Sequence, residues 1–415
     1  MRKKDIKIKV NKNLWRKMKE KVESEFGEKF CDSDCLLIVL LLAVYKRKNK
    51  QRSHDNKYLS CESSTEFDDD NYFQKTISVY AELLDHLQKD TEKVNYSQII
   101  ENAIGDYLYL PMNFYTDCIS PLYTIVGSKN NTMQKATAEA VDKMNLINDD
   151  LTVIDGCCAT GALFFGLKTY SWKNIILNDM NPLRTNFLNV IKLKPLTLIK
   201  MILDTDLSFI EQPDSKNEKL HIFKNSTTSY ETKRRNYKKV DCNVKIAYEM
   251  FLLQCIDKAM IERSDKIFER LTRFLPAHLK LKNASITQSD CLTYLNNDNI
   301  PKLVLLDVPY IGSEKECAIK DYHYESFHKK VANHLQQAKY PFIYYCRSSA
   351  PKHNTTKTHA ENLKIMKVKL GLHFFNKNFY FHKVHLKEDT ELLISNRNYD
   401  MDKQFQWTDF KQDLL

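Results

Sequence analysis

Short apolar runs that stop at a polar residue recur in the second half of the chain. The clearest is Leu303–Leu306, which is followed by Asp307, Val308, Pro309 and Tyr310. Runs of the same kind occur at 152–155 and 174–179. A branched apolar run of this length predicts a strand buried on both faces, as in a parallel sheet. The polar residues that follow would then lie at the carboxyl edge of the sheet, where open α/β folds bind their ligands.

From about residue 113 such strands alternate with helical periodicity. A long, largely helical insertion that carries Lys and Arg interrupts the alternation at about 193–285. This order predicts an α/β domain over 113–415 with a Rossmann-like sheet. We expect its strands at Thr152–Asp155, Asn174–Asn178, Ala284–Gln288, Leu303–Leu306, Pro341–Tyr345 and Glu391–Asn396, with a helix beginning at Ala162.

The first 110 residues carry a different pattern, and they carry it twice. Ile8–Trp15 aligns without gaps on Ile77–Leu84, and each segment continues as an amphipathic helix and a turn. A second helix is expected to begin at Ser33 or Ser97, because serine is a good N-cap. This order resembles a ribbon-helix-helix unit, closely over 74–109 and less well over 5–48, which has about five extra residues between its helices. The polar stretch 49–72 is expected to be a flexible connector.

Ribbon-helix-helix units pair their strands into an antiparallel ribbon that enters the major groove of DNA. Two copies in one chain allow this ribbon to form within the chain. With Ile6, Ile8 and Val10 toward the core, alternation turns their neighbours outward. The residues expected to face DNA are Lys7, Lys9, Asn11, Thr76, Ser78 and Tyr80. The alternative interpretation of 1–110 is a small helical domain that docks a partner or stabilises the rest of the chain.

Charge and cysteine usage fit a protein that binds a polyanion in a reducing compartment. The net charge is +10, and the first fifty residues hold 15 Lys and Arg against 7 Asp and Glu. The 11 cysteines show no paired CxxC clusters and no zinc spacing, so we expect reduced thiols and no metal. The apolar run Leu36–Tyr45 is too short to span a bilayer and too far from Met1 for a signal peptide. We therefore expect a buried helix in a cytoplasmic protein.

Glycine is scarce, with 8 residues in 415, yet Gly156 and Gly161 both fall in the turn after the first expected strand. A turn with glycine lets the backbone approach a ligand, and the helix that follows offers free N–H groups. The segment Asp155–Ala162 resembles the loop Asp-Pro-Phe-x-Gly-Ser-Gly, with which amino-methyltransferases hold the methionine part of S-adenosyl-L-methionine. Gly156 stands at the proline position, and Ala159 stands at the first loop glycine.

Three further segments resemble the same family. Asn178–Pro182 is similar to the Asn-Asp-x-Asn-Pro stretch of the Dam-like adenine methyltransferases, which implies that Asp179 binds the ribose. Tyr123–Lys129 resembles the Gly-Gly-Lys element near the cofactor carboxylate, and Ile286–Asp290 resembles the strand whose acid meets the cofactor adenine. The residues implied in cofactor binding are Tyr123, Gly127, Lys129, Asp155, Gly156, Cys157, Gly161, Asp179, Met180 and Asp290.

The segment Asp307–Tyr310 resembles the family's Asp-Pro-Pro-Tyr motif, with Val308 at the first proline position. The resemblance implies that the Asp307 carboxylate and the Val308 carbonyl accept hydrogen bonds from the N6 amine of adenine. Tyr310, held after Pro309, would stack on the base once it is flipped from the duplex. Arg234 and Arg235 in the insertion are expected to contact phosphate, although a charged run of this kind also suits a solvated face.

These patterns together predict a site-specific DNA methyltransferase of the Dam-like family. Its cofactor would be S-adenosyl-L-methionine, and its partners would be double-stranded DNA and a cognate restriction endonuclease. One alternative is a non-catalytic DNA-binding regulator with a degenerate methyltransferase domain, as Ala159 and Val308 would suggest. Another is methylation of an amine in RNA or protein, since the motif serves planar amines generally.

Overall fold

The computed structural model describes residues 3–50, 72–88, 95–123, 131–146, 150–205, 242–256, 264–296, 301–308, 324–347, 379–385 and 390–397. Backbone contacts divide the chain into two compact units. The first unit comprises Met1–Leu122, Asn189–Asn236 and Asp241–Lys282, and the second comprises Tyr123–Leu188, Tyr237–Val240 and Asn283–Leu415. Most of the insertion expected at about 193–285 therefore belongs to the same compact unit as the N-terminal segment.

The second unit is built on a seven-stranded sheet in the order β5-β4-β3-β6-β7-β9-β8. The first five of these strands are parallel, whereas β9 is antiparallel to both of its neighbours, so β8 runs in the direction of the first five. Six of the seven strands thus share one direction, and the predicted mixed α/β fold with a mostly parallel sheet is confirmed. The strands are β3 (Thr152–Asp155), β4 (Asn174–Asn178), β5 (Ala284–Thr287), β6 (Lys302–Leu306), β7 (Phe342–Arg347), β8 (Tyr380–His385) and β9 (Thr390–Ser395).

The strand order reverses between β3 and β6. From β3 the chain adds β4 and then β5 on one side, and it later adds β6 and β7 on the other side. Such a reversal is a topological switch point, where an open sheet leaves a crevice outside the carboxyl ends of its strands. The residues that follow β3 and β6 therefore occupy the position where this class of sheet binds ligands.

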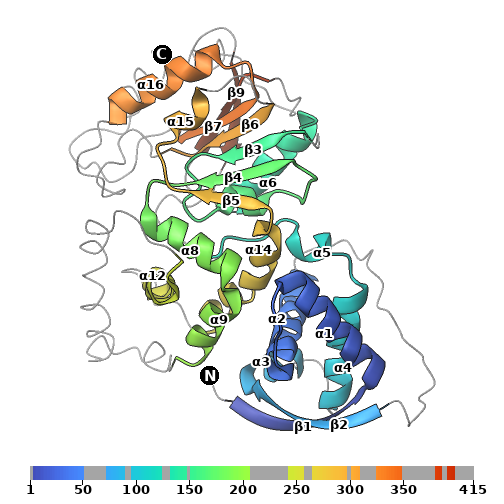
Figure 1. Ribbon diagram of the computed structural model, residues 1–415. Helices are drawn as coiled ribbons and strands as arrows, with labels where there is room; N and C mark the ends of the chain where they lie inside the picture. The colour runs from blue at the N-terminus through green and yellow to red at the C-terminus, as the bar shows by residue number, and fades with distance from the viewer. Residues whose placement is uncertain are drawn as a thin grey trace. The chain divides into compact units, whose positions relative to one another are not determined.

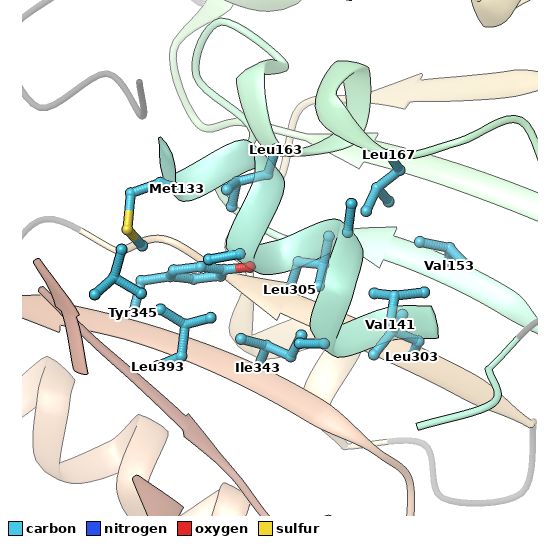
Figure 2. Packing of buried hydrophobic residues seen from close by; sticks show 14 of the residues in the cluster. Met133, Val141, Val153, Leu163, Leu167, Leu303, Leu305, Ile343, Tyr345 and Leu393 are labelled. Carbon is cyan, nitrogen blue, oxygen red and sulfur yellow. The ribbon is translucent and has the colours of Figure 1, made fainter. Parts of the chain in front are cut away.

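Both faces of the sheet are buried, as the apolar strand sequences predicted. Leu303 and Leu305 of β6 point to one face, where they pack with α6 (Asn131–Lys143) and α7 (Ala162–Gly166), and Figure 2 shows these side chains meeting those of α6. Val304 and Leu306 point to the other face, toward α16 (Tyr324–Gln337) and α15 (Leu292–Leu295). α8 (Pro182–Leu193) follows β4.

The first unit contains a two-stranded antiparallel ribbon formed by β1 (Lys3–Asn11) and β2 (Tyr72–Tyr80). Lys7 pairs with Thr76 at its centre. Each strand leads directly into a helix, and a second helix follows. The pairs are α1 (Lys12–Phe26) with α2 (Asp32–Lys50), and α3 (Ala81–Gln88) with α4 (Tyr96–Tyr109). Figure 1 shows these helices on one side of the ribbon.

The two copies differ by the number of residues that the sequence suggested. Helix α1 begins at residue 12 and α2 at residue 32, a separation of 20, whereas α3 begins at residue 81 and α4 at residue 96, a separation of 15. The first copy therefore has five extra residues between helix starts. The expected serine caps are wrong, because the Asn95 side chain caps α4 and Ser33 lies within α2. The Ser97 hydroxyl instead accepts a hydrogen bond from the Lys9 backbone N–H.

Helix α2 is buried over the whole run Leu36–Tyr45, as predicted. The other helices of this unit among the described residues are α5 (Asn113–Thr116), α9 (Pro195–Leu203), α12 (Val244–Ile256), α13 (Ser264–Leu271) and α14 (Phe274–Leu281). In the part of the chain that the structure describes, no helix combines the length and the apolar character needed to cross a membrane.

Insertion helices pack against the N-terminal helices through aromatic pairs and buried hydrogen bonds. The Phe26 and His278 rings stack with centroids 4.8 Å apart, and those of His86 and Phe268 stack at 4.5 Å. The Lys280 ammonium, which is buried, donates to the Thr116 carbonyl. These contacts join segments more than 150 residues apart in the sequence into one body.

Candidate cofactor and DNA-binding sites

Three carboxylates lie at the carboxyl ends of neighbouring strands. Asp155 is the last residue of β3 and pairs in register with Leu305 of β6 and Leu177 of β4. Asp307 and Asp179 each follow two residues beyond those partners. Because the strands are parallel, their ends meet at one edge of the sheet. The structure therefore brings together three of the acids that the sequence singled out.

Asp155 is buried in an unusual way. Its side chain is 1% exposed, and neither carboxylate oxygen accepts a hydrogen bond of normal geometry from a residue that the structure describes, although the Phe164 backbone N–H lies near enough to oppose the rise in its pKa. Burial, together with the carboxylates of Asp307 and Asp179, holds the pKa of Asp155 well above its usual range. A buried carboxyl group without donors favours its neutral form, and a cation brought beside it would restore the charge.

The loop after β3 has the backbone of a glycine-rich turn. Gly161 has φ +71°, and Ala159 has φ +49°, which is a left-handed conformation that non-glycine residues seldom adopt. A side chain at Gly156 would meet the Leu306 side chain at 2.8 Å, so only glycine fits there without movement. The Gly156 N–H donates to the Leu305 carbonyl, which holds the loop against β6. Ala159 thus occupies a backbone position suited to the glycine that it replaces.

Asp179 links the two loops that follow β3 and β4. One of its oxygens accepts from the Ala159 N–H at 2.9 Å and lies 3.3 Å from an Arg184 nitrogen. The other oxygen accepts from the Asn181 N–H at 2.7 Å, at the start of α8. Asp179 therefore orders the turn before α8, and two of its donors are backbone groups of the candidate cofactor loop and of this turn.

Asn178 is a residue whose role the sequence did not reveal. Its side chain is fully buried, and its amide nitrogen donates to the carbonyls of Gly156 and Ser289. Its amide oxygen accepts from the Thr287 hydroxyl and from the Ser289 N–H. Asn178 thus joins the ends of β3, β4 and β5. The only sequence signal was its place beside Asp179 at the end of an apolar run.

The two thiols of the loop after β3, those of Cys157 and Cys158, are held in the protonated form. A hydrogen bond with the Cys291 thiol, together with burial, raises the pKa of Cys157 well above its usual range. Burial also raises the pKa of Cys158. The seven cysteines whose side chains the structure describes are all free. Among the described residues, no cluster of His, Cys, Asp and Glu could hold a metal ion.

The other predicted site residues have varied surroundings. Val308 is buried in the core, Asp307 beside it is half-buried, and Met180 is 53% exposed. Asp290 is exposed and accepts a hydrogen bond from the Leu292 N–H at the start of α15. Tyr123 is buried edge-to-face against Phe187. Gly127, Lys129, Pro309, Tyr310, Arg234 and Arg235 lie outside the described residues, as does most of the connector 49–72.

The ribbon exposes four of the six residues predicted to face DNA: Lys7, Lys9, Thr76 and Ser78. The expected outward orientation of Tyr80 is wrong, because Tyr80 is buried and its hydroxyl donates to Asp204 at 2.9 Å. Strand alternation fails there because Tyr80 is the last residue before α3. Asn11 is half-buried, and its side chain caps α1. Gln74, which was not predicted to face DNA, is exposed on the same face of the ribbon.

A separate cavity of about 730 Å³ lies within the first unit. Its lining includes Phe26, Pro195, Met201, Tyr248 and His278. None of the residues predicted to bind the cofactor lines it, so this cavity is not the candidate cofactor site.

The chain matches no model of a known protein family, and a search of curated proteins finds no relative. The structure itself defines a mixed α/β protein with a mostly parallel sheet.

Proposed function

We propose that the protein is an S-adenosyl-L-methionine-dependent DNA methyltransferase that methylates the N6 amine of a flipped adenine. The observation that carries this proposal is the convergence of Asp155, Asp179 and Asp307 at the switch point of the sheet. Their segments are those that resemble the family's methionine-binding loop, ribose-binding acid and catalytic motif. The reversal of strand order between β3 and β6 also supports the proposal, because open α/β sheets bind their ligands at such a switch point.

The cofactor fits the observed donors and acceptors. The ammonium of its methionine part would supply the hydrogen-bond donors that the buried Asp155 carboxylate lacks among the described residues. Asp179 would accept the ribose hydroxyls, and Asp290 would meet the adenine. Tyr123, Gly127, Lys129, Gly156, Cys157, Gly161 and Met180 would complete the pocket, with Lys129 near the cofactor carboxylate. When bound, the cofactor supplies an activated methyl group on a sulfonium.

The protein's own contribution is to orient the amine. An exocyclic adenine amine is a poor nucleophile because its lone pair is delocalised into the ring. The Asp307 carboxylate and the Val308 carbonyl would each accept one amine hydrogen, which directs the lone pair toward the methyl group. Tyr310, beyond Pro309, would stack on the flipped base and exclude water. Orientation of this kind supplies much of the acceleration in reactions that need no strong base.

The N-terminal ribbon would supply DNA affinity. Lys7 and Lys9 are exposed on the face opposite the helices, where a ribbon inserted in the major groove contacts bases and phosphates. Arg234 and Arg235 would add phosphate contacts. A cognate restriction endonuclease is a natural partner for an enzyme of this kind.

Transfer of label from radioactive S-adenosyl-L-methionine to unmethylated AT-rich DNA tests the proposal. We expect label in N6-methyladenine, and we expect Asp307→Ala to abolish it while leaving cofactor binding largely intact. Asp150→Ala, at an exposed acid ahead of β3, is the matched control and should keep full activity. Undiminished transfer by Asp307→Ala would remove Asp307 from the mechanism.

A second candidate is a DNA-binding regulator without transfer activity. One observation favours it: the methyl group of Ala159 stands in a left-handed turn where the family has glycine, within the loop that would hold the cofactor. Calorimetric titration with S-adenosyl-L-methionine separates the two candidates. Absence of cofactor binding by a folded protein that binds DNA would establish the regulator.

A further inference from the structure

The outward face of the ribbon is a continuous polar surface. Three residues of β1 alternate outward, and three residues of β2 lie opposite them in register. The pairs are Asp5 with Ser78, Lys7 with Thr76, and Lys9 with Gln74. All six side chains are exposed. We call these six residues the ribbon face.

The two copies of the strand-helix-helix pattern are related by a local pseudo-two-fold axis. The start of α1 at residue 12 corresponds to the start of α3 at residue 81, a shift of 69. The same shift carries Lys7 onto Thr76, and these two residues are paired in the ribbon. The axis therefore passes through the Lys7–Thr76 pair. It relates Lys9 to Ser78 and Asp5 to Gln74.

None of these related positions holds the same residue twice. One end of the ribbon face presents Lys9 beside Gln74, whereas the other presents Asp5 beside Ser78, whose hydroxyl hydrogen-bonds the Asp5 carboxylate. Within the ribbon face, the first end carries the Lys9 ammonium and the second carries the Asp5 carboxylate. Lys3, next along β1 at the second end, is exposed but ion-paired with Asp204 at 3.2 Å. The backbone of the ribbon is thus nearly symmetric, but its chemical surface is not.

A DNA-binding protein with two-fold symmetry binds a palindromic site, because each half of the protein contacts an identical half-site. This ribbon has two different halves within a single chain. We propose that the ribbon face of one chain recognises a non-palindromic duplex sequence, an inference that rests on the proposed DNA-binding function. The occupant is double-stranded DNA, since the two lysines of the ribbon face and the excess of basic residues in the first fifty suit a polyanion.

The side chains indicate what each half prefers. Lysine donates to the O6 and N7 acceptors of guanine, and glutamine makes a paired contact with adenine. The Lys9–Gln74 end therefore selects purine edges in the major groove. A carboxylate accepts from the N4 amine of cytosine and repels phosphate. The Asp5–Ser78 end accordingly selects cytosine, and it contributes less to affinity than the Lys9–Gln74 end.

Selection of bound duplexes from a random library by the full-length protein tests the inference. We expect an asymmetric consensus, with guanine and adenine concentrated on one flank, and one chain on the shortest duplex that binds. Native mass spectrometry measures this stoichiometry. An inverted-repeat consensus, or two chains on that shortest duplex, would overturn the inference.

A symmetrised variant makes the test sharper. Asp5→Gln combined with Ser78→Lys gives both ends of the ribbon face the same pair of side chains. The selected sequence should then become an inverted repeat of the Lys9–Gln74 half-site. Asp85→Gln combined with Ser24→Lys makes the same charge change at exposed positions of α3 and α1, and this control should select the wild-type consensus. An unchanged consensus for the symmetrised variant would show that these side chains do not read the DNA.

These outcomes separate the inference from the proposed function. A palindromic consensus with methyl transfer intact would overturn the inference and leave the methyltransferase standing. Failure to enrich any duplex, with no methyl transfer, would overturn both. Circular dichroism of the symmetrised variant confirms that it is folded, since both substituted side chains are exposed.

Discussion

Asp155 combines full burial with the lack of a well-formed hydrogen bond from any described residue, so its ionised form is costly in the folded protein. Its folded-state pKa is raised above the value of about 3.9 expected in the unfolded chain. Between those two pKa values the folded state holds a proton that the unfolded state has lost. The free energy of unfolding therefore falls as pH rises through this window.

Asp155→Asn should remove this pH dependence, because asparagine does not ionise. The variant should gain stability relative to the wild type as pH rises, by up to about 1.4 kcal/mol per pH unit within the window. Urea unfolding followed by Trp172 fluorescence measures this, with Trp15 and Trp407 replaced by phenylalanine so that only the second unit is observed. Parallel pH profiles for the two proteins would contradict the assignment.

Ala159 tests the cofactor loop in another way. A left-handed backbone costs an L-residue roughly 1–2 kcal/mol, and glycine avoids that cost. Ala159→Gly should therefore stabilise the protein by up to about 1 kcal/mol, less than the full strain because glycine gains entropy when unfolded. Cofactor affinity should hold or rise as the methyl group is removed.

The matched control is Ala138→Gly, in the interior of helix α6. Glycine inside a helix costs about 1 kcal/mol, so this variant should lose stability. Thermal unfolding of both variants against the wild type gives the comparison. Equal destabilisation by the two substitutions would argue that the backbone at 159 is not strained.

Residue-level prediction succeeded where a local pattern carried the information. The placement of Asp155, Asp179 and Asp307 at one edge of the sheet was predictable because each ends or follows a buried apolar run, and parallel strands bring such ends together. Asn178 was missed because two of its hydrogen-bond partners, Thr287 and Ser289, lie more than a hundred residues away. Tyr80 was misplaced because alternation does not continue where a strand passes into a helix.

At the scale of elements, helix α14 shows how a short helix is held by its neighbours. All eight of its residues are buried, including His278, which stacks on Phe26. The His278 Nδ1 donates to the carbonyl of Lys192. Burial lowers the pKa of His278 to about 4, against an ordinary value of 6.5. At a pH between those two values the ring is neutral in the folded protein and takes up a proton when the protein unfolds.

The first unit should accordingly lose stability as pH falls from about 6.5 to about 4, by up to about 3 kcal/mol from this histidine alone. His278→Phe keeps an aromatic ring against Phe26 but cannot titrate, so its stability should fall less over the same range. Urea unfolding followed by Trp15 fluorescence gives the profile. His334→Phe, on α16 of the second unit, is the control and should follow the wild type.

Elements were predicted well where periodicity was strong. Strands β3 and β4 have the expected bounds, and the ribbon strands pair as two copies in one chain should. Strand β8 (Tyr380–His385) was not predicted, because its sequence mixes aromatic, basic and apolar residues without a clean alternation. It is defined by pairing with β9, which is a tertiary property.

At the scale of the whole molecule, the sequence suggested a break near residue 110 that the contacts do not follow. The insertion helices complete the core of the N-terminal unit, with Phe268 against His86 and Lys280 bonded to Thr116. Contacts across such distances leave no local sequence signal. Removal of 1–110 would uncover buried side chains of α13 and α14, so truncation would confuse a loss of DNA contacts with a loss of folding.

Point variants on the full-length chain avoid this confusion. Lys7→Gln combined with Lys9→Gln removes two exposed charges from the ribbon without touching the core. If both lysines displace counterions from DNA, the slope of log affinity against log salt should flatten by up to about 2. Lys329→Gln combined with Lys330→Gln makes the same charge change on α16, where both lysines are exposed, and should leave the slope unchanged. Fluorescence anisotropy at several salt concentrations measures both slopes. Equal flattening in the two variants would mean that affinity follows net charge rather than the ribbon, and an unchanged slope in both would exclude the ribbon from the interface with DNA.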